Sequence, residues 1–342
     1  MRAGYRGGTM KTWLGIWLLM VAGIGDASML ARSAGAQMLL VANQEDATMS
    51  VIDPGTGRTM ATVTEGVPGQ WAHEVAASPD GRTAYLPVYG NSGVGKPGID
   101  GSELLVVDLA SRKIAHTIDF GHGVRPHLPV LDAQRHLLYV TTELDDAVTV
   151  IDTRTLQIVG KVPTGQKESH MLALSHDGRY GYTANVGPGT VSVLDMVARK
   201  TLAVIPVSGE VQRISVSMDD RSVFTSDQTQ PRLAVIDAAA RTIRHWVALP
   251  GLGYGTAPTP DGRWLLVAIP AKNAVAVVDL QAMRLARTVA VAKAPQEILI
   301  HGHVAYVSCA ASGQVAAIHL ANWKVEKLIQ AGKWADGIAW AD

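Results

Sequence analysis

The sequence predicts an all-β fold, a seven-bladed β-propeller with four-stranded blades. One observation is a short strand that ends in an acid and recurs along the chain. Another is a turn signal that keeps step with it. The third is the composition: Val, Ile and Thr are frequent, and Gly plus Pro make up 50 of 342 residues. That mixture is typical of many short strands joined by tight turns.

The strand-end acid recurs at nearly even spacing. Its six acidic copies are Asp53, Asp108, Asp152, Asp195, Asp237 and Asp279, and a seventh copy ends in His319. Successive intervals are 55, 44, 43, 42, 42 and 40 residues. Each unit contains four alternating β runs and no run with a helical period of 3.6. A period of about 40 to 50 residues with four strands per unit predicts propeller blades.

The turn signal precedes the second strand of several units. Clear copies occur at 78–81, 175–178 and 259–262, and weaker copies begin near Asp132 and Asp219. The first unit contains only three strands, at 38–41, 48–53 and 58–63. The missing strand is found at the C-terminus, at 336–340. We therefore expect the last strand to complete the first blade and to close the ring, which hides two sheet edges.

The N-terminal segment 1–36 predicts a secretory signal peptide. Basic residues precede an apolar run from Trp13 to Ile24, and the small residues 34–36 offer a cleavage site near Ala36. An uncleaved anchor is the alternative, although the run is shorter than the ~20 residues of a spanning helix. We expect a periplasmic or secreted protein with one propeller domain over 37–342 and no membrane span after cleavage.

Charge and cysteine content exclude several classes of protein. Thirty basic and thirty acidic residues give no net charge, which argues against a nucleic-acid-binding surface. The single cysteine, Cys309, excludes an internal disulfide and any cysteine-rich zinc site. A small packing residue explains Cys309 better than a nucleophile.

Two units carry a recognisable pattern. Residues 138–141 (Leu-Tyr-Val-Thr) with 147–152, and residues 182–185 (Tyr-Thr-Ala-Asn) with 190–195, match the motif of the YVTN-repeat propellers. The mature chain therefore resembles this family, which is YncE-like and belongs with lactonase-like propellers. The resemblance implies a secreted or periplasmic binding protein. Related propellers include lactonases and the haem d1 and nitrous-oxide reductase propellers, so the fold does not fix the function.

One repeat position gathers the residues suited to chemistry. Counted back from the strand-end acid, it is occupied by His73, His127, His170, Gln212, Tyr254, Gln296 and Asp336. The first strand of a blade lines the channel, so the three histidines and Asp336 should be contiguous at its mouth. They are candidate ligands for one transition metal, and His73, His127 and His170 are candidate catalytic acids or bases. Scaffold histidines that bind only water and backbone are the alternative.

Other residues are expected on the same face. Trp71, Arg125 and Trp334 join Gln212, Tyr254, Gln296 and Asp336 as candidate ligand-binding residues, and Arg125 suits an anionic group such as a carboxylate. Glu74, Arg213 and Glu297 follow the histidine position by one residue. They could face between blades, because neighbouring residues of a strand point to opposite sides. The insertion 90–102 is either a lid or an unimportant loop.

Two functions remain open from the sequence. We favour an extracytoplasmic propeller that binds a small polar or anionic ligand, or a periplasmic partner protein, at the channel mouth. The alternative is a metal- or His-assisted enzyme of the lactonase or lyase type that uses His73, His127, His170 and Asp336. No residue set is diagnostic of a reaction, so the sequence does not decide whether the protein is an enzyme.

Overall fold

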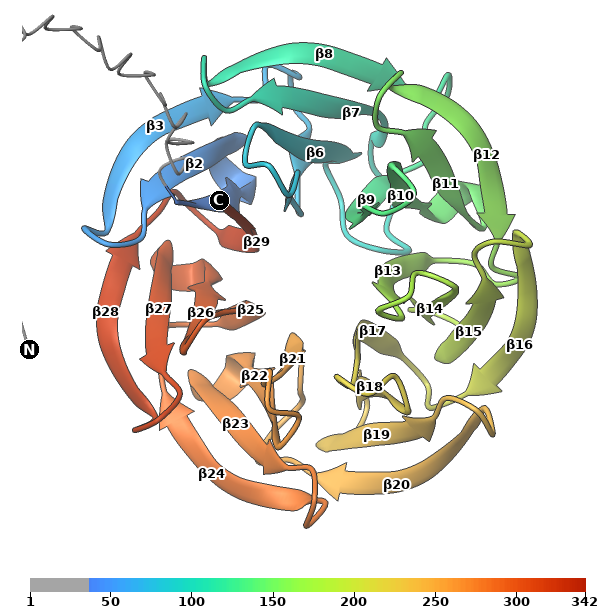
Figure 1. The fold of residues 1–342 in the computed structure, drawn as a ribbon, viewed down its shortest axis with the longest axis vertical. Coiled ribbons are helices and arrows are strands. Elements are labelled where there is room, and N and C mark those ends of the chain that lie inside the picture. The colour runs from blue at the N-terminus through green and yellow to red at the C-terminus, as the bar shows by residue number, and fades with distance from the viewer. Residues whose placement is uncertain (1–36) are drawn as a thin grey trace, which may run out of the picture. The chain divides into compact units, whose positions relative to one another are not determined.

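The computed structural model describes residues 37–342, which form seven antiparallel sheets arranged as blades around a central axis (Figure 1). Six blades have four strands, and the remaining blade has five because its inner strand is interrupted. The predicted seven-bladed propeller is therefore confirmed. The predicted signal peptide, 1–36, lies outside the described residues. Among the residues that are described, no helix has the length and hydropathy needed to span a membrane.

Blade 1 combines strands from the two ends of the described residues, and blade 2 follows it in the chain. Blade 1 contains β29 (Ala335–Ala341), β1 (Met38–Asn43), β2 (Thr48–Asp53) and β3 (Arg58–Thr64). Blade 2 contains β4 (Trp71–Ala72), β5 (Ala76–Ala77), β6 (Thr83–Gly90), β7 (Asp100–Asp108) and β8 (Lys113–Asp119).

Blades 3 to 5 are regular. Their strands are β9 (Pro126–Asp132), β10 (Leu137–Thr142), β11 (Ala147–Asp152) and β12 (Gln157–Pro163); β13 (Ser169–Leu174), β14 (Tyr180–Asn185), β15 (Thr190–Asp195) and β16 (Lys200–Pro206); and β17 (Val211–Val216), β18 (Ser222–Asp227), β19 (Arg232–Asp237) and β20 (Thr242–Ala248).

Blades 6 and 7 complete the ring. Their strands are β21 (Thr256–Pro258), β22 (Trp264–Ile269), β23 (Ala274–Asp279) and β24 (Arg284–Ala290); and β25 (Pro295–His301), β26 (Val304–Cys309), β27 (Gln314–His319) and β28 (Lys324–Gln330). Short 3₁₀ turns follow four second strands: η1 (Gln44–Asp46), η2 (Glu143–Asp145), η3 (Pro270–Lys272) and η4 (Ala310–Ser312).

The repeated acid is a turn residue. Each copy ends the third strand of its blade, and its carboxylate accepts backbone N–H groups two or three residues later, as Asp195 does from Val197 and Ala198. His319 fills the same role in blade 7, where its Nδ1 accepts the N–H of Ala321 at 3.2 Å. The seventh copy therefore keeps the turn with a different acceptor.

The ring closes where β29 joins the first three strands. β29 pairs antiparallel with β1 and thereby completes blade 1, as the sequence predicts (Figure 1). The closure also requires a glycine, because a Cβ on Gly337 would lie 2.5 Å from the Cα of Glu74 in blade 2. Gly337 donates its N–H to the carbonyl of His73 at 2.8 Å, which ties blade 1 to the interrupted inner strand of blade 2.

Apolar side chains fill the spaces between blades. One buried cluster joins blades 7 and 1 through Val315, Ile329, Leu39 and Ile338. Cys309 lies in another cluster with no exposed surface, and burial raises the pKa of its thiol to about 11. The structure therefore agrees with a packing role for this residue.

Candidate functional site

The three histidines of the shared repeat position lie together at the channel axis. The His127 and His170 rings are 3.5 Å apart between centroids, and His73 is 5.3 Å from His127. Inner strands β9 and β13 carry two of them, and His73 lies between β4 and β5. The predicted contiguity of these side chains is therefore found, across blades 2, 3 and 4.

A second repeat position supplies their partners. Counted from the start of the second strand of each blade, the seventh residue is Gln44 in blade 1, Tyr89 in blade 2 and Glu143 in blade 3. The strand pairings place these three residues at equivalent positions. Each packs against the histidine of the next blade. The corresponding residues of blades 4, 6 and 7 are Val186, Pro270 and Ala310, and that of blade 5 is Gln228, whose amide donates to the carbonyl of Gly253. The residues that pack against a histidine are therefore confined to blades 1, 2 and 3.

Two of these partners make hydrogen bonds that fix ring nitrogens. The Gln44 amide donates to His73 Nε2 at 2.8 Å. His170 donates from Nδ1 to Glu143 Oε1, and the Tyr89 hydroxyl donates to Glu143 Oε2 at 2.8 Å. Glu143 thus orients His170 while the Tyr89 ring packs edge-on to it, with centroids 6.0 Å apart.

His127 has a different environment. Tyr89 meets it ring to ring at 5.3 Å and offers it no hydrogen bond, and His127 Nδ1 is buried without a partner among the described residues. An unpartnered buried polar atom costs about 1–3 kcal/mol, so it marks a place where a water or ligand atom would be stabilising.

The residues after the histidine position also face the axis. β17 and β25 each contain a register shift that spans this position, between Val211 and Ile214 and between Pro295 and Ile298. A bulge places two residues of one strand opposite one of its neighbour, so strict alternation fails there. Arg213 and Glu297 consequently point toward the centre, and the alternative that they face between blades is not what the structure shows.

Arg213 is the centre of a buried ion cluster. Its Nη1 lies 2.6 Å from Glu74 Oε1 and also pairs with Glu297 Oε2, and its Nη2 lies 3.2 Å from Asp336 Oδ1. The guanidinium carbon is 4.9 Å from the centre of the Tyr254 ring. Three carboxyl groups therefore share one guanidinium, which leaves an excess of acid in a buried place.

Burial shifts the protonation of this cluster. Desolvation raises the pKa of Glu74 well above its ordinary value and raises the pKa of Glu297 and of Asp336, although Arg213 opposes each shift. Burial, aided by the nearby charges of His170 and Arg213, lowers the pKa of His73 to about 3 and that of His127 well below its ordinary value. Burial thus favours the neutral form of these carboxyl groups, opposed by Arg213, and keeps the imidazoles of His73 and His127 neutral.

Such a cluster can donate and accept hydrogen bonds and can also exchange protons. A neutral imidazole is an acceptor or base, and a carboxyl group with a raised pKa is a donor or acid. The arrangement suits a polar ligand, and it also keeps the acid–base enzyme hypothesis open.

The geometry does not form a metal centre. Within residues 37–342, no group of three or more His, Cys, Asp or Glu residues is placed so that it could hold a metal ion. His170 Nδ1 is directed at Glu143, and Asp336 is paired with Arg213. The hypothesis of a metal held by His73, His127, His170 and Asp336 stays a prediction.

The side chain of Arg125 donates its hydrogen bonds to the insertion 90–102. Its Nε donates to Asp100 at 2.6 Å and its Nη2 to the carbonyl of Lys96 at 2.7 Å, and its side chain is buried. At the far end of the insertion, a Cβ on Gly95 would meet the Glu168 carboxylate at 2.9 Å. The insertion therefore extends from blade 2 past blade 3 to blade 4, beside the residues that precede His127 and His170. Its last residues, 100–102, belong to β7.

The remaining predicted ligand-binding residues are spread around the ring. Asp336 belongs to the ion cluster, and Tyr254 packs on Arg213. Gln212 and Gln296 are half-buried, and the amide of Gln296 donates to its neighbouring carbonyl of Ala294. Trp71 Nε1 is buried without a partner in the described chain. Trp334 is not at the axis but lines a cavity between blades 7 and 1.

Comparisons with known proteins support the fold. The Cytochrome D1 heme domain family matches residues 133–253, a segment that contains His170 and Arg213 but not His73, His127 or Asp336. No curated protein matches the chain.

Many solved structures are similar to this chain, among them the following two. Hydrazine synthase of Kuenenia stuttgartiensis has 18% identity and a TM-score of 0.69, over 84% of this chain and 93% of that one. Dihydro-heme d1 dehydrogenase NirN in complex with DHE has 14% identity and a TM-score of 0.63, over 88% of this chain and 74% of that one. At these identities the likeness concerns the fold.

The histidines do not fit axial ligation of a haem as they lie here. Imidazole is the right kind of ligand for haem iron. However, the exposed fractions of His73, His127 and His170 are 9%, 1% and 2%. An iron outside the cluster could not reach their nitrogens unless the residues around them moved. We therefore derive no step through a haem.

Proposed function

We propose that this protein binds a small polar ligand at the mouth of the propeller channel. The observation that carries the proposal is the buried cluster of His73, His127, His170 and Arg213 with its three carboxyl groups. A fold held by apolar blade contacts has no need of so many ionisable groups at its centre, because their desolvation is costly.

The ligand should offer both hydrogen-bond donors and acceptors. His127 Nδ1 and Arg213 Nε are buried without hydrogen-bond partners among the described residues. A ligand could supply the missing partner of each atom. Arg125 does not serve an anionic ligand in this proposal, because its hydrogen bonds go to the insertion. A polar, uncharged or cationic ligand agrees better with one guanidinium among three carboxyl groups.

Native mass spectrometry tests this proposal. Wild type, His127→Ala and the matched control His245→Ala, an exposed residue of β20, are each incubated with a small-molecule extract. We expect a bound mass on wild type and on the control, and its loss in His127→Ala. Equal binding by all three proteins, or binding by none, would reject the channel mouth as the site.

A tetrapyrrole is the second candidate ligand, because the family match and the NirN complex concern haem d1-type groups. The burial of the imidazoles opposes it. Titration with haem, followed by absorbance, separates the two: a saturable spectral change that His170→Ala abolishes would favour the tetrapyrrole, and an unchanged spectrum would reject it.

We also propose that the protein is exported and that it belongs to the YVTN-repeat family. Segment 1–36 would direct the protein to the periplasm or medium, where the ligand would be met. Comparison of the mature N-terminus with Gln37 tests the export.

A further inference from the structure

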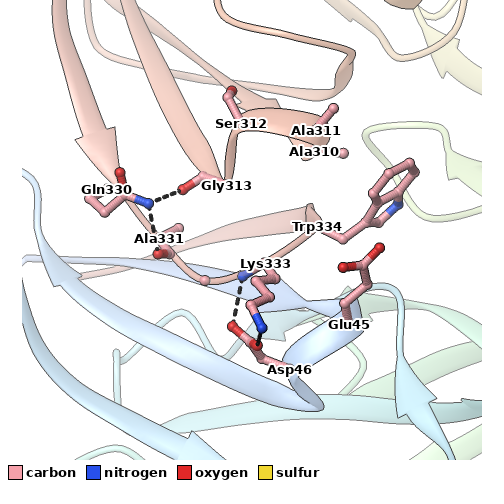
Figure 2. A pocket seen from close by; sticks show the side chains of 11 residues that line it. Glu45, Asp46, Ala310, Ala311, Ser312, Gly313, Gln330, Ala331, Lys333 and Trp334 are labelled. Atoms are coloured by element: carbon pink, nitrogen blue, oxygen red, sulfur yellow. Dashed lines mark hydrogen bonds and ion pairs between the residues drawn. The ribbon is translucent and has the colours of Figure 1, made fainter.

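A cavity opens where the ring closes, and none of the three clustered histidines lines it. It has a volume of about 440 Å³ and lies between blades 7 and 1. Its walls are η1 with Glu45 and Asp46 on one side and η4 on the other, and the segment 330–334 forms its floor (Figure 2). The η4 wall contributes only small side chains, Ala310, Ala311 and Ser312, so the space beside the indole stays open.

Trp334 stands at one end of this cavity, near Glu45 (Figure 2). Its exposed fraction is 37%, so part of the indole faces solvent. Its backbone is held firmly, because the N–H of Gln44 donates to its carbonyl at 3.1 Å.

The backbone of Trp334 is a repeat feature. Its φ of 56° is left-handed, as are those of Arg125, Glu168 and Ala294, each of which precedes the shared repeat position by two residues. The strain therefore belongs to the chain reversal into the inner strand. The indole itself is what distinguishes blade 1 at this position.

The charges beside the indole do not cancel. Asp46 accepts the backbone N–H of Lys333 at 2.7 Å and lies 3.8 Å from its ammonium group (Figure 2). Lys333 is thus the counterion of Asp46. Glu45 forms no ion pair with any residue of 37–342. One uncompensated carboxylate therefore lies next to an exposed aromatic face.

We propose that this cavity binds an organic cation through a methylated or primary ammonium group. Such a group is attracted to an indole face and to a carboxylate at once, and the alanine wall leaves room for its methyl groups. A bare metal ion does not suit the cavity, since it would need several oxygen ligands around one point. The proposal does not depend on a ligand at the histidine cluster.

Calorimetric titration with choline tests the proposal, with 3,3-dimethylbutan-1-ol as its uncharged isostere. We expect saturable binding of choline and none of the isostere. Trp334→Ala and Glu45→Gln should each weaken binding by about threefold or more, the size of a partly solvated cation–π or ionic contact.

One control separates this site from general charge. Glu326→Gln removes an exposed acid from β28 of blade 7 and should bind choline like wild type. Trp334→Phe guards against misfolding and should retain part of the affinity. Equal binding of choline and its isostere, no saturable binding at millimolar choline, or unchanged binding by Glu45→Gln and Trp334→Ala would overturn the proposal.

Discussion

Arg213 of blade 5 pairs with Asp336 of blade 1 across the axis of the propeller, with 3.2 Å between Nη2 and Oδ1. The two residues are 123 positions apart in the chain and lie on opposite sides of the ring (Figure 1). The same guanidinium holds Glu74 of blade 2 and Glu297 of blade 7. One side chain therefore links four blades, including the blade that closes the ring.

Arg213→Met should destabilise the protein strongly. Removal of one partner from a buried ionic cluster costs about 3–5 kcal/mol, because the remaining carboxyl groups lose their counterion. The loss should be larger near neutral pH than at about pH 5, because more of these carboxyl groups are ionised at the higher pH and so depend on the Arg213 counterion. Urea unfolding at both pH values measures it. Arg58→Met, at an exposed position of β3, is the control; equal losses in the two variants would contradict the central role of Arg213.

Glu65→Gln should make the protein more stable above pH 5. Burial raises the pKa of Glu65 from 4.5 to about 8, although its Oε2 accepts the N–H of Ala72. The folded protein thus holds a proton that the unfolded chain releases above pH 4.5, so stability falls as pH rises from about 4.5 to about 8. The slope from this group approaches about 1.4 kcal/mol per pH unit.

The glutamine keeps the acceptor and removes the titration. Denaturant unfolding across this pH window should therefore show a flatter profile for Glu65→Gln than for wild type. A variant profile parallel to that of wild type would show that Glu65 is ionised in the folded protein.

Arg125→Ala should release the insertion without unfolding the blades. The three donors of Arg125 reach Asp100 and the carbonyls of Gly93 and Lys96. Hydrogen exchange and limited proteolysis should show lost protection confined to 91–99. Arg112→Ala, which removes an exposed hydrogen bond to Met60, should leave this segment protected. Unchanged protection in Arg125→Ala would mean that other contacts hold the insertion.

Glu143→Ala should change the proton position on His170. Because Glu143 accepts from His170 Nδ1 and from the Tyr89 hydroxyl, we expect His170 to carry its proton on Nδ1 in wild type. Ring-nitrogen NMR should show this tautomer in wild type and in Tyr89→Phe, and a mixture of tautomers in Glu143→Ala. The same tautomer in all three proteins would show that Glu143 does not orient the ring.

Most of the fold could be predicted from the sequence, because each blade repeats its own signals. The strand-end acids mark the turns, as at Asp195, and the missing first strand revealed the closure by β29. The interruption of the inner strand of blade 2 was not predicted from the sequence; Gly337 of blade 1 packs on Glu74 at that point, a contact between residues far apart in the chain.

The site was predictable only in part. The shared repeat position identified His73, His127 and His170, which do lie together. Glu143 and Tyr89 were missed, although their common position after the second strand is a signal that a second alignment would reveal. The inward direction of Arg213 depends on a bulge that the sequence does not display. Arg125 is of the right residue type for an anionic ligand, as predicted, yet it donates its hydrogen bonds to residues of the insertion, such as Asp100.

The most direct test of the channel-mouth proposal is ring-nitrogen NMR of protein labelled in its 11 histidines, recorded with and without a small-molecule extract. Single alanine variants assign the signals. The account predicts that the signals of His73, His127 and His170 shift on addition while those of surface histidines such as His245 stay in place. Shifts confined to the surface histidines, or no shift at all, would contradict it.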